Sequence, residues 1–395
     1  MTNKKGSRYL KFFQRSLFDH PTDDVESLVE SELDNIQREK ILIPLLALQS
    51  VKGIGLKTLY DIYDSELLSD FDKLKLDEKY FREKYSKTIK KQLLDEIFKK
   101  YDYLIESAFN LEEIFDRESI EFIPSIHQYF PKSLYRMNEP PRWLFVKGDL
   151  NAIISDYIIG IVGTRDPSHI GRRLSFHISK EFVKRNFIVL SGFAKGIDKE
   201  AHRGAVEYYG QSIAVLGHGF NSKYSNIDKK LEDDLISNDG AIITEYFPSE
   251  FPSSKSFLRR NEIIASMSKL IIPVETYSIE KSGTGATIRR AKKIGTPVIG
   301  VMPPNSNSNN LQNTLSGLKE IGYESYEFST SDENGLWMYI NKLFPNHKND
   351  DNLKERQERY FKHMLKLAEA NKKDVLQDDK SIDELAEYLR IKLKE

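Results

Sequence analysis

Two stretches of the chain decide its fold, Ile159–Arg165 (IGIVGTR) and Leu190–Asp198 (LSGFAKGID). Each one carries an apolar run into small residues, and a polar helical pattern follows it. A parallel β-strand delivers the chain in this way to a phosphate-sized crevice at its carboxyl end. We therefore expect the binding chemistry of this protein to lie at that edge of a sheet.

Similar runs recur between Tyr157 and Met302. The apolar runs are 158–162, 187–190, 212–216, 241–243, 270–274 and 297–301. They are separated by amphipathic segments, for example 171–185, 198–209 and 284–294. Continuous apolar strands that alternate with helices form a parallel sheet covered on both faces. The pattern predicts an α/β fold, an extended Rossmann-like, doubly wound parallel sheet.

The chain is long enough for more than one domain. It has 395 residues, and a single core stops growing at roughly 250–300 residues. We predict a charged N-terminal arm at 1–40, a helical domain at 41–118, the Rossmann-like domain at 119–345 and a charged helical tail at 346–395. The tail has only narrow apolar stripes, which favour an interaction arm or a small helical cap.

The helical domain contains a glycine-rich turn, Val51–Leu59 (VKGIGLKTL). Gly53 and Gly55 bracket one apolar residue between two helical patterns, as in a helix-hairpin-helix (SAM-like) module. Such glycines let backbone N–H groups approach a phosphate, with Lys52 and Lys57 nearby. A plain glycine turn between two packed helices fits the same residues equally well.

Composition excludes several classes of protein. With 59 Lys+Arg against 60 Asp+Glu, the net charge is −1, so affinity for nucleic acid requires a local basic patch. The absence of cysteine excludes disulfides and thiolate metal sites. No run of about 18 apolar residues occurs. We therefore expect a soluble, cytoplasmic protein with no membrane partner and no metal site.

Small and polar residues follow the predicted strands, and a helix follows each of them. These candidate phosphate-binding residues are Gly163, Thr164, Arg165, Ser191, Gly192, Lys195, Gly217, Gly219, Ser282, Gly283 and Thr284. Helix N-termini hold free N–H donors and a favourable dipole for an anion. The dinucleotide fingerprint and the Walker A motif are both absent, so we predict no nicotinamide cofactor and no ATP hydrolysis of that kind.

A basic groove with an aromatic side chain is predicted at the same edge. Arg165, Lys195 and Arg260 lie on or beside turns, and Phe257 is the best placed aromatic residue. Cations bind the phosphates of a single strand, while a ring or a guanidinium plane stacks on a base. Four further cations are expected instead to solvate helix faces: Arg172, Arg173, Lys199 and Arg203.

Three residues are assigned supporting roles. Asp198 is expected as the N-cap or first-turn acid of a helix, with His202 four residues later on the same face. His202 could form an acid–base pair or half of a metal site, but we favour a link from the helix start to the loop. Glu245 could be a general base, although a charge partner of Arg165 or Arg260 is favoured. We predict no catalytic constellation and hence no enzyme.

Seven motifs occur in a fixed order between about residues 120 and 305. They are the stretch 129–148 with its Pro140-Pro141, Val162–Arg165, Ser191–Asp198 with His202, Ile213–Gly219, Glu245-Tyr246, Phe257–Asn261 with Ile263–Ala265, and Ser282–Thr287. Together they resemble the DNA-processing protein A family, also called Smf. The amino-terminal helical module also lies where that family commonly carries a small helical domain.

The resemblance implies a non-enzymatic, homodimeric protein that binds and protects single-stranded DNA. Such a protein would help to load a RecA-type recombinase during natural transformation. Carried over by position, the strand-binding pocket would contain Gly163, Arg165, Ser191, Gly192, Lys195, Phe257, Arg260 and Asn261.

The sequence departs from the family pattern at several positions. Leu258 replaces a proline and Glu262 replaces an arginine, which predicts weaker or redirected phosphate binding. The family's winged-helix tail is not recognisable in 346–395, so a divergent member is indicated, for example one that acts in defence against foreign DNA. Two alternatives stay open: a nucleotide-derivative sensor or hydrolase of the related superfamily, and an adaptor whose helical arms bind a partner.

Overall fold

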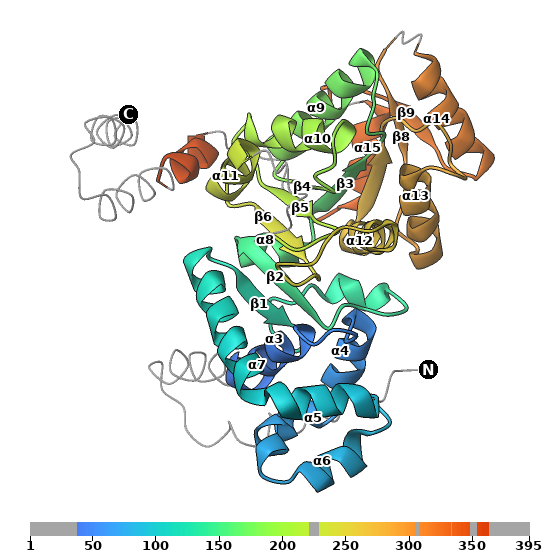
Figure 1. The fold of residues 1–395 in the computed structure, drawn as a ribbon. Coiled ribbons are helices and arrows are strands. Elements are labelled where there is room, and N and C mark those ends of the chain that lie inside the picture. The colour runs from blue at the N-terminus through green and yellow to red at the C-terminus, as the bar shows by residue number, and fades with distance from the viewer. Residues whose placement is uncertain (1–37, 221–228, 305–307, 333, 348–353, 363–395) are drawn as a thin grey trace. The chain divides into compact units, whose positions relative to one another are not determined.

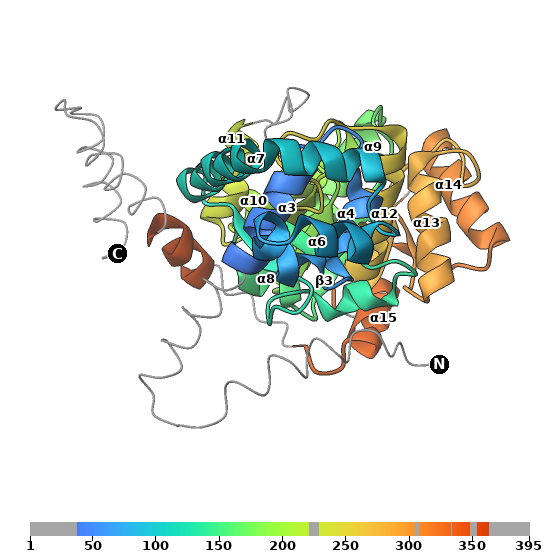
Figure 2. The same cartoon turned by 60° about the horizontal axis from the view of Figure 1, so that its bottom comes forward.

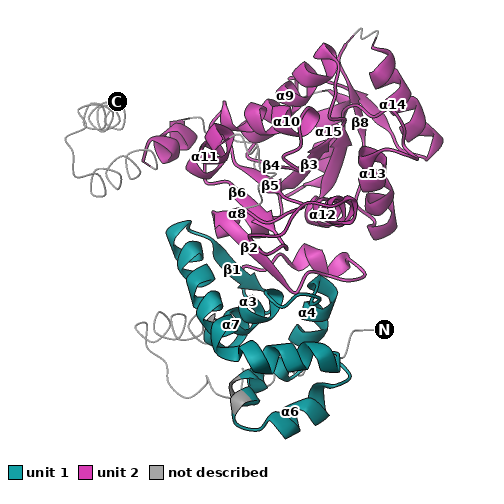
Figure 3. Cartoon of the chain, in the orientation of Figure 1, with its two compact units in different colours: residues 1–128 teal, residues 129–395 magenta. Residues whose placement is uncertain are grey.

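The computed structural model describes residues 38–220, 229–304, 308–332, 334–347 and 354–362, which Figures 1 and 2 show from two directions. The contacts divide the chain into two compact units, Met1–Gln128 and Tyr129–Glu395 (Figure 3). Most of the predicted arm at 1–40 and of the predicted tail at 346–395 lies outside the described residues. The four predicted domain limits remain predictions.

Unit 1 is helical in its described part. Its elements are the π-helix η1 (Arg38–Leu42), α3 (Ile43–Gln49), α4 (Leu56–Tyr63), α5 (Leu67–Asp70), the 3-10 helix η2 (Phe71–Lys75), α6 (Glu78–Tyr85), α7 (Lys91–Arg117) and the strand β1 (Glu121–Pro124). The long helix α7 buries Leu94, Ile97 and Leu104 along one face, and α3 packs against it. This stripe is the 3.6-residue repeat of an amphipathic helix, so α7 forms one wall of the core of unit 1.

The glycine turn predicted at Val51–Leu59 joins α3 to α4. Gly53 has φ 101°, a left-handed conformation that strains any other residue, and a Cβ there would be 3.3 Å from Leu93 Cδ2. Gly55 is the extended N-cap of α4, and the side chains of Lys52 and Lys57 are exposed. This geometry fits both interpretations of the turn, so phosphate binding there stays a prediction.

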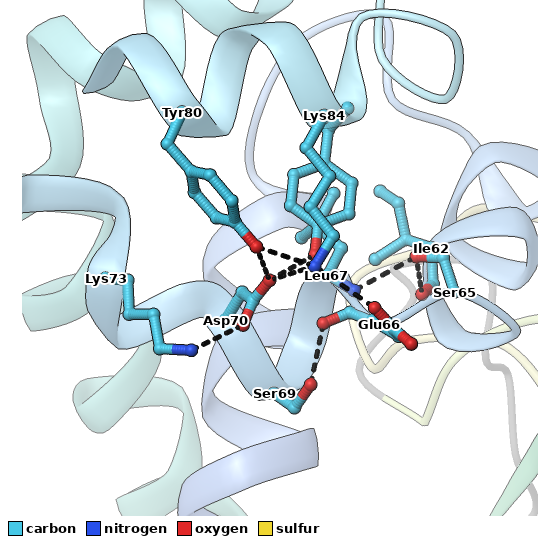
Figure 4. A network of polar contacts seen from close by, with 10 residues as sticks. Ile62, Ser65, Glu66, Leu67, Ser69, Asp70, Lys73, Tyr80 and Lys84 are labelled. Carbon is cyan, nitrogen blue, oxygen red and sulfur yellow. Dashed lines mark hydrogen bonds and ion pairs between the residues drawn. The ribbon is translucent and has the colours of Figure 1, made fainter. Parts of the chain in front are cut away.

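A buried carboxylate ties α5 to α6 (Figure 4). Asp70 accepts hydrogen bonds from Lys84 Nζ (2.7 Å), Tyr85 Oη (2.6 Å), Lys73 Nζ (2.9 Å) and Tyr80 Oη (3.3 Å). Burial opposes ionisation, but the hydrogen bonds from Lys84, Tyr85 and Lys73 outweigh it and hold the pKa of Asp70 well below its usual value. Asp70 is therefore charged and fully paired at neutral pH.

Unit 2 contains a six-stranded sheet in the order β2-β6-β5-β4-β3-β7. Its strands are β2 (Trp143–Gly148), β3 (Ile158–Val162), β4 (Ile188–Ser191), β5 (Ser212–Val215), β6 (Ala241–Thr244) and β7 (Leu270–Pro273). β2 pairs antiparallel with β6, and the other pairs are parallel. The chain proceeds from β3 through β4 and β5 to β6, and then returns to place β7 on the other side of β3. The strand order therefore reverses at β3, which confirms the predicted doubly wound fold.

Helices cover both faces of this sheet. They are η3 (Lys132–Arg136), α8 (Leu150–Ile154), α9 (His169–Lys184), α10 (Ile197–Val206), α11 (Lys229–Ser237), α12 (Ser254–Met267), α13 (Gly283–Ile294), α14 (Asn309–Glu320) and α15 (Gly335–Leu343). Figure 1 shows α9 and α10 on one side of the strands and α12 and α13 on the other. Both views place α14 next to α13. No helix of the described residues could cross a membrane.

The strand predicted at 297–301 lies outside the main sheet. β8 (Gly300–Met302) pairs with β9 (Ser325–Glu327) in a separate parallel pair, and only a bridge between Ile271 and Val298 joins this region to β7. Membership of the six-stranded sheet, which the alternating pattern predicted for this run, was therefore wrong. The run is apolar because Ile299 and Val301 are buried in the same core as β3 and β7.

The described part of the C-terminal tail, residues 354–362, is helical and docks on unit 2. Arg356 donates to Tyr208 O (3.3 Å) and to Asn186 Oδ1 (3.4 Å), while Arg359 Nε lies 3.4 Å from Asp239 Oδ2. Asn186, Tyr208 and Asp239 lie just beyond the C-terminal ends of α9, α10 and α11. A cation is favoured at the negative end of a helix dipole, so the two arginines hold this segment against the amino ends of β4, β5 and β6.

Candidate nucleic-acid site at the carboxyl edge of the sheet

The predicted site residues follow successive parallel strands. Gly163, Thr164 and Arg165 follow β3, Ser191, Gly192 and Lys195 lie at or after the end of β4, and Gly217 and Gly219 follow β5. Phe257, Arg260 and Asn261 lie on α12, whereas Ser282, Gly283 and Thr284 start α13. Because carboxyl ends of parallel strands meet at one edge, these residues share one side of the sheet.

Asp198 lies in the first turn of α10 and collects donors from two loops. Its Oδ2 accepts a hydrogen bond from Ala194 N (3.4 Å), and the polar groups of Ser191 and Gly163 lie close enough to lower its pKa. Burial raises the pKa of Asp198, and the charge of Arg260 together with these donors partly offsets the rise. Asp198 thus fixes the loop after β4 to the start of α10.

Arg260 is buried beneath the same loops, with 5% of its surface exposed. Its Nη1 donates to Val215 O at 3.0 Å and to Gly192 O, so one guanidinium joins the carboxyl ends of β4 and β5. Burial lowers the pKa of Arg260, and the charge of Asp198 acts in the opposite direction. An arginine stays protonated in proteins, so a permanent positive charge lies under the loops.

Two guanidinium groups lie near the aromatic ring of Phe257. The Cζ atoms of Arg165 and Arg260 lie 5.1 and 5.9 Å from its ring centroid. The ring rests on Gly217, where a Cβ would be 2.8 Å from Phe257 Cδ1. Arg165 itself is exposed, so it can contact a ligand beside the ring.

The loop that carries Lys195 contacts the loop that carries Arg165 through backbone atoms. The next residue, Gly196, has φ 92° and faces the loop after β3, because a Cβ there would be 2.5 Å from Thr164 O and 2.7 Å from Arg165 O. The side chain of Lys195 is exposed. Two exposed cations, Arg165 and Lys195, are therefore carried by loops in direct contact.

The remaining predicted site residues make structural contacts. Asn261 Nδ2 donates to Gly283 O (3.2 Å), and Ser282 Oγ accepts from Gly285 N (2.9 Å) as the N-cap of α13. Thr284 is buried, and Gly219 N donates to Glu250 O (2.9 Å). These residues connect α12 to α13 and the β5 loop to the β6 loop, and their contact with a ligand stays a prediction.

Glu245 is a charge partner, but of a different residue from the two that were expected. Its fully buried carboxylate accepts two hydrogen bonds from Arg259 Nε at 3.0 and 3.1 Å. The prediction that it pairs with Arg165 or Arg260 was wrong. Consecutive residues on a helix point about 100° apart, so Arg259 faces the end of β6 while Arg260 faces β4 and β5.

Glu262, one of the departures from the family pattern, lies between two arginines of unit 2. Its Oε2 is 3.8 Å from Arg259 Nη1 and 3.8 Å from Arg290 Nε. The carboxylate thus reduces the positive potential on this side of α12 and does not contact Arg165 or Arg260.

His202 holds α10 both to the sheet and to the loop before the helix. Its Nδ1 is 2.8 Å from Ser212 Oγ at the start of β5, and its ring packs on Phe193. Burial lowers its pKa to about 3, with Arg260 and Lys199 adding to the effect, so the ring is neutral. The contact with Phe193, which lies in the loop before α10, is the expected link to the loop, and the contact with Ser212 adds a link to the sheet. Within the described ranges, no cluster of three potential metal ligands occurs.

Glu275, which follows β7, was not among the predicted site residues. Its buried carboxylate accepts hydrogen bonds from Ser168 N (2.9 Å) and Ser168 Oγ (2.6 Å). Its backbone oxygen accepts a hydrogen bond from Thr164 N (2.8 Å). An acid just after an apolar strand, the pattern that marked Glu245, was the signal available in the sequence.

Arg203 is one of the four cations expected on helix faces. It is exposed and forms an ion pair with Glu200 at 2.9 Å, three residues earlier on α10. An exposed pair of this kind stabilises a helix only weakly, which fits a solvated helix face.

Comparison with known proteins identifies relatives of this chain. The family described as DNA recombination-mediator protein A matches residues 121–324. DNA processing protein DprA of Bacillus subtilis (strain 168) is 32% identical over 184 residues, which are 47% of this chain and 61% of that protein. Protein Smf of Escherichia coli (strain K12) is 34% identical over 185 residues, 47% of this chain and 49% of that protein. The similarity thus spans only about half to three fifths of these relatives.

One solved structure shares the fold. The X-ray structure of DNA processing protein A from Streptococcus pneumoniae aligns with a TM-score of 0.55 and 23% identity, over 74% of this chain and 96% of that chain.

Proposed function

The chain belongs to the DNA recombination-mediator protein A family, and from that premise we propose that unit 2 binds single-stranded DNA at the carboxyl edge of its sheet. The observation that carries the proposal is the ring of Phe257 close to the guanidinium groups of Arg165 and Arg260. A single strand needs an aromatic face for a base and cations for the phosphates on either side of it.

Each residue has a distinct part in this proposal. The exposed cations Arg165 and Lys195 bind phosphates, and Phe257 stacks on an unpaired base. Arg260 contributes charge from below and holds the two strand ends in place. A duplex buries its base faces, so this arrangement favours a single strand.

We extend the proposal to the role of a recombination mediator. Bound strands would be protected and passed to a RecA-type recombinase, with the chain acting as a cytoplasmic homodimer. The family description and the names of the relatives support this role. The bound strands would come either from DNA that the cell takes up or from foreign DNA that the cell attacks. We propose no reaction and no cofactor.

The test measures binding of a fluorescent oligo-dT by anisotropy at several salt concentrations, with a duplex of equal length alongside. Arg165→Ala and Lys195→Ala should each lower the affinity for an oligonucleotide of any sequence. Each should also make the affinity less dependent on salt concentration, by the contribution of about one phosphate contact. Lys293→Ala is the matched control, because Lys293 is an exposed cation in the last turn of α13. Equal binding by Arg165→Ala and Lys293→Ala, or tighter binding to the duplex, would refute the proposed site.

A further inference from the structure

The reversal of strand order at β3 creates a second candidate anion site, separate from the ring of Phe257. Doubly wound sheets bind small phosphate ligands where the strand order reverses, with the phosphate at the N-terminus of the following helix. Here that position lies between the ends of β3 and β7, at the start of the 16-residue helix α9.

In this protein a side chain of the same chain, the carboxylate of Glu275, occupies this position. Its two oxygens accept hydrogen bonds from the backbone and the side chain of Ser168, the N-cap of α9. The first turn of α9 is shaped around the carboxylate, because a Cβ on Gly171 would be 2.5 Å from Glu275 Oε2. A phosphate could not enter without displacing this side chain.

The N-cap residue of a second helix also lies close to this carboxylate. Ser308, the N-cap of α14, lies with its Oγ 3.5 Å from Glu275 Oε1. Glu275 is completely buried, and no ion pair joins it to a cation in the described part of the chain. Its charge is therefore stabilised by the neutral donors and helix dipoles that would otherwise serve a bound phosphate.

We propose that Glu275 is an internal anion that closes the switch-point crevice to free phosphate and nucleotides. It is thus a specificity-determining residue. Phosphate monoesters, the ligand class of a nucleotide sensor or hydrolase, are rejected at this crevice. The ring of Phe257 on α12 and the exposed cations Arg165 and Lys195, which follow β3 and β4, stay available to a polymer. This inference does not depend on single-strand binding.

The test is anion rescue, in which melting temperature is followed while sodium phosphate or sodium acetate replaces sodium chloride at constant ionic strength. Glu275→Ala should melt below wild type in chloride, and phosphate or acetate should restore stability in a concentration-dependent way. Glu275→Gln fills the same volume and should show no rescue. A folded Glu275→Ala without any response to either anion would overturn the proposal.

Titration calorimetry of wild type and of Glu275→Ala with inorganic phosphate and with AMP gives a second readout. No binding by wild type is expected up to millimolar concentrations, and binding by wild type as tight as by Glu275→Ala would overturn the proposal. Should the alanine variant not fold, Glu275→Ser carries the same rescue experiment. Oligo-dT binding by Arg165→Ala and Lys195→Ala tests the DNA site separately, so failure of the DNA site and failure of this inference are distinguishable.

Discussion

Asp198 and Arg260 approach each other across Gly192, which leaves no room for a side chain between them. A Cβ on Gly192 would lie 2.8 Å from Asp198 Oδ2 and would overlap Arg260 Nη1. One charge belongs to α10 and the other to α12, so the two charges link helices on opposite faces of the sheet at the edge that carries the proposed site.

Gly192→Ala should destabilise unit 2 by about 1–3 kcal/mol, because the added methyl group forces the guanidinium of Arg260 away from the strand ends. Chemical denaturation followed by fluorescence measures the change. Gly283→Ala is the control, since no atom lies within 4 Å of a Cβ built there, and it should change stability by less than about 0.5 kcal/mol.

Asp198→Asn should cost roughly 3–5 kcal/mol, because the amide leaves the buried charge of Arg260 without compensation. It should also weaken oligo-dT binding by disordering the loops after β3 and β4. Asp166→Asn removes an exposed carboxylate from the same β3 loop and should be close to neutral. Equal melting temperatures for the two variants would contradict the role given to Asp198.

Phe257→Ala should weaken oligo-dT binding by roughly 1–3 kcal/mol, the range measured for one stacked base. Phe257→Tyr keeps the ring and should bind nearly as wild type. Leu258→Ala changes the exposed neighbour on α12 and serves as the matched control. Anisotropy titrations decide the matter, and an alanine variant that binds like the tyrosine variant would exclude stacking.

Glu250→Gln should alter the pH dependence of stability. Burial, reinforced by the nearby charge of Glu245, raises the pKa of Glu250 to about 7. Because its pKa is raised on folding, Glu250 makes its full contribution to folding stability below its unfolded pKa of about 4.3. That contribution is lost as the pH rises from there toward 7. The glutamine variant should therefore gain melting temperature relative to wild type at pH 8 but not at pH 4. A constant difference across this range would contradict the assignment.

Asp70→Asn should destabilise unit 1 at neutral pH by about 1–3 kcal/mol, because the hydrogen bonds from Lys84 and Tyr85 lose their charged acceptor. Since the pKa of Asp70 is lowered on folding, its contribution is complete above pH about 4 and disappears as the acid is protonated below that. Hydrogen exchange of α5 and α6 measures the effect. Asp61→Asn, an exposed change on α4, is the control.

The sequence was sufficient to predict which segments alternate between strand and helix. Apolar runs such as 158–162 and 187–190 predicted buried parallel strands. The small residues after these runs predicted the edge of the sheet at which the loops meet. That level of structure depends on local pattern and on the rule that parallel strands end at one side.

The partners of charged residues could not be predicted in the same way. Glu245 and Arg259 are separated by a loop whose path is set by tertiary packing, so the spacing in the sequence did not show which arginine is the partner of Glu245. The pair of Glu275 and Ser168 could not be predicted, because the two residues are 107 positions apart in the sequence. Such pairs depend on side-chain direction and burial, which spacing alone does not determine.

The arginine contacts of residues 354–362 have a practical consequence. They hold this segment at the starts of β4 and β5, a full strand length from Gly192 and Gly217. Since the chain contains no cysteine, Lys362→Cys at the exposed end of the segment would give one thiol for a maleimide dye or a surface tether. Single-molecule work on DNA capture could anchor the protein there and leave the capturing edge unobstructed.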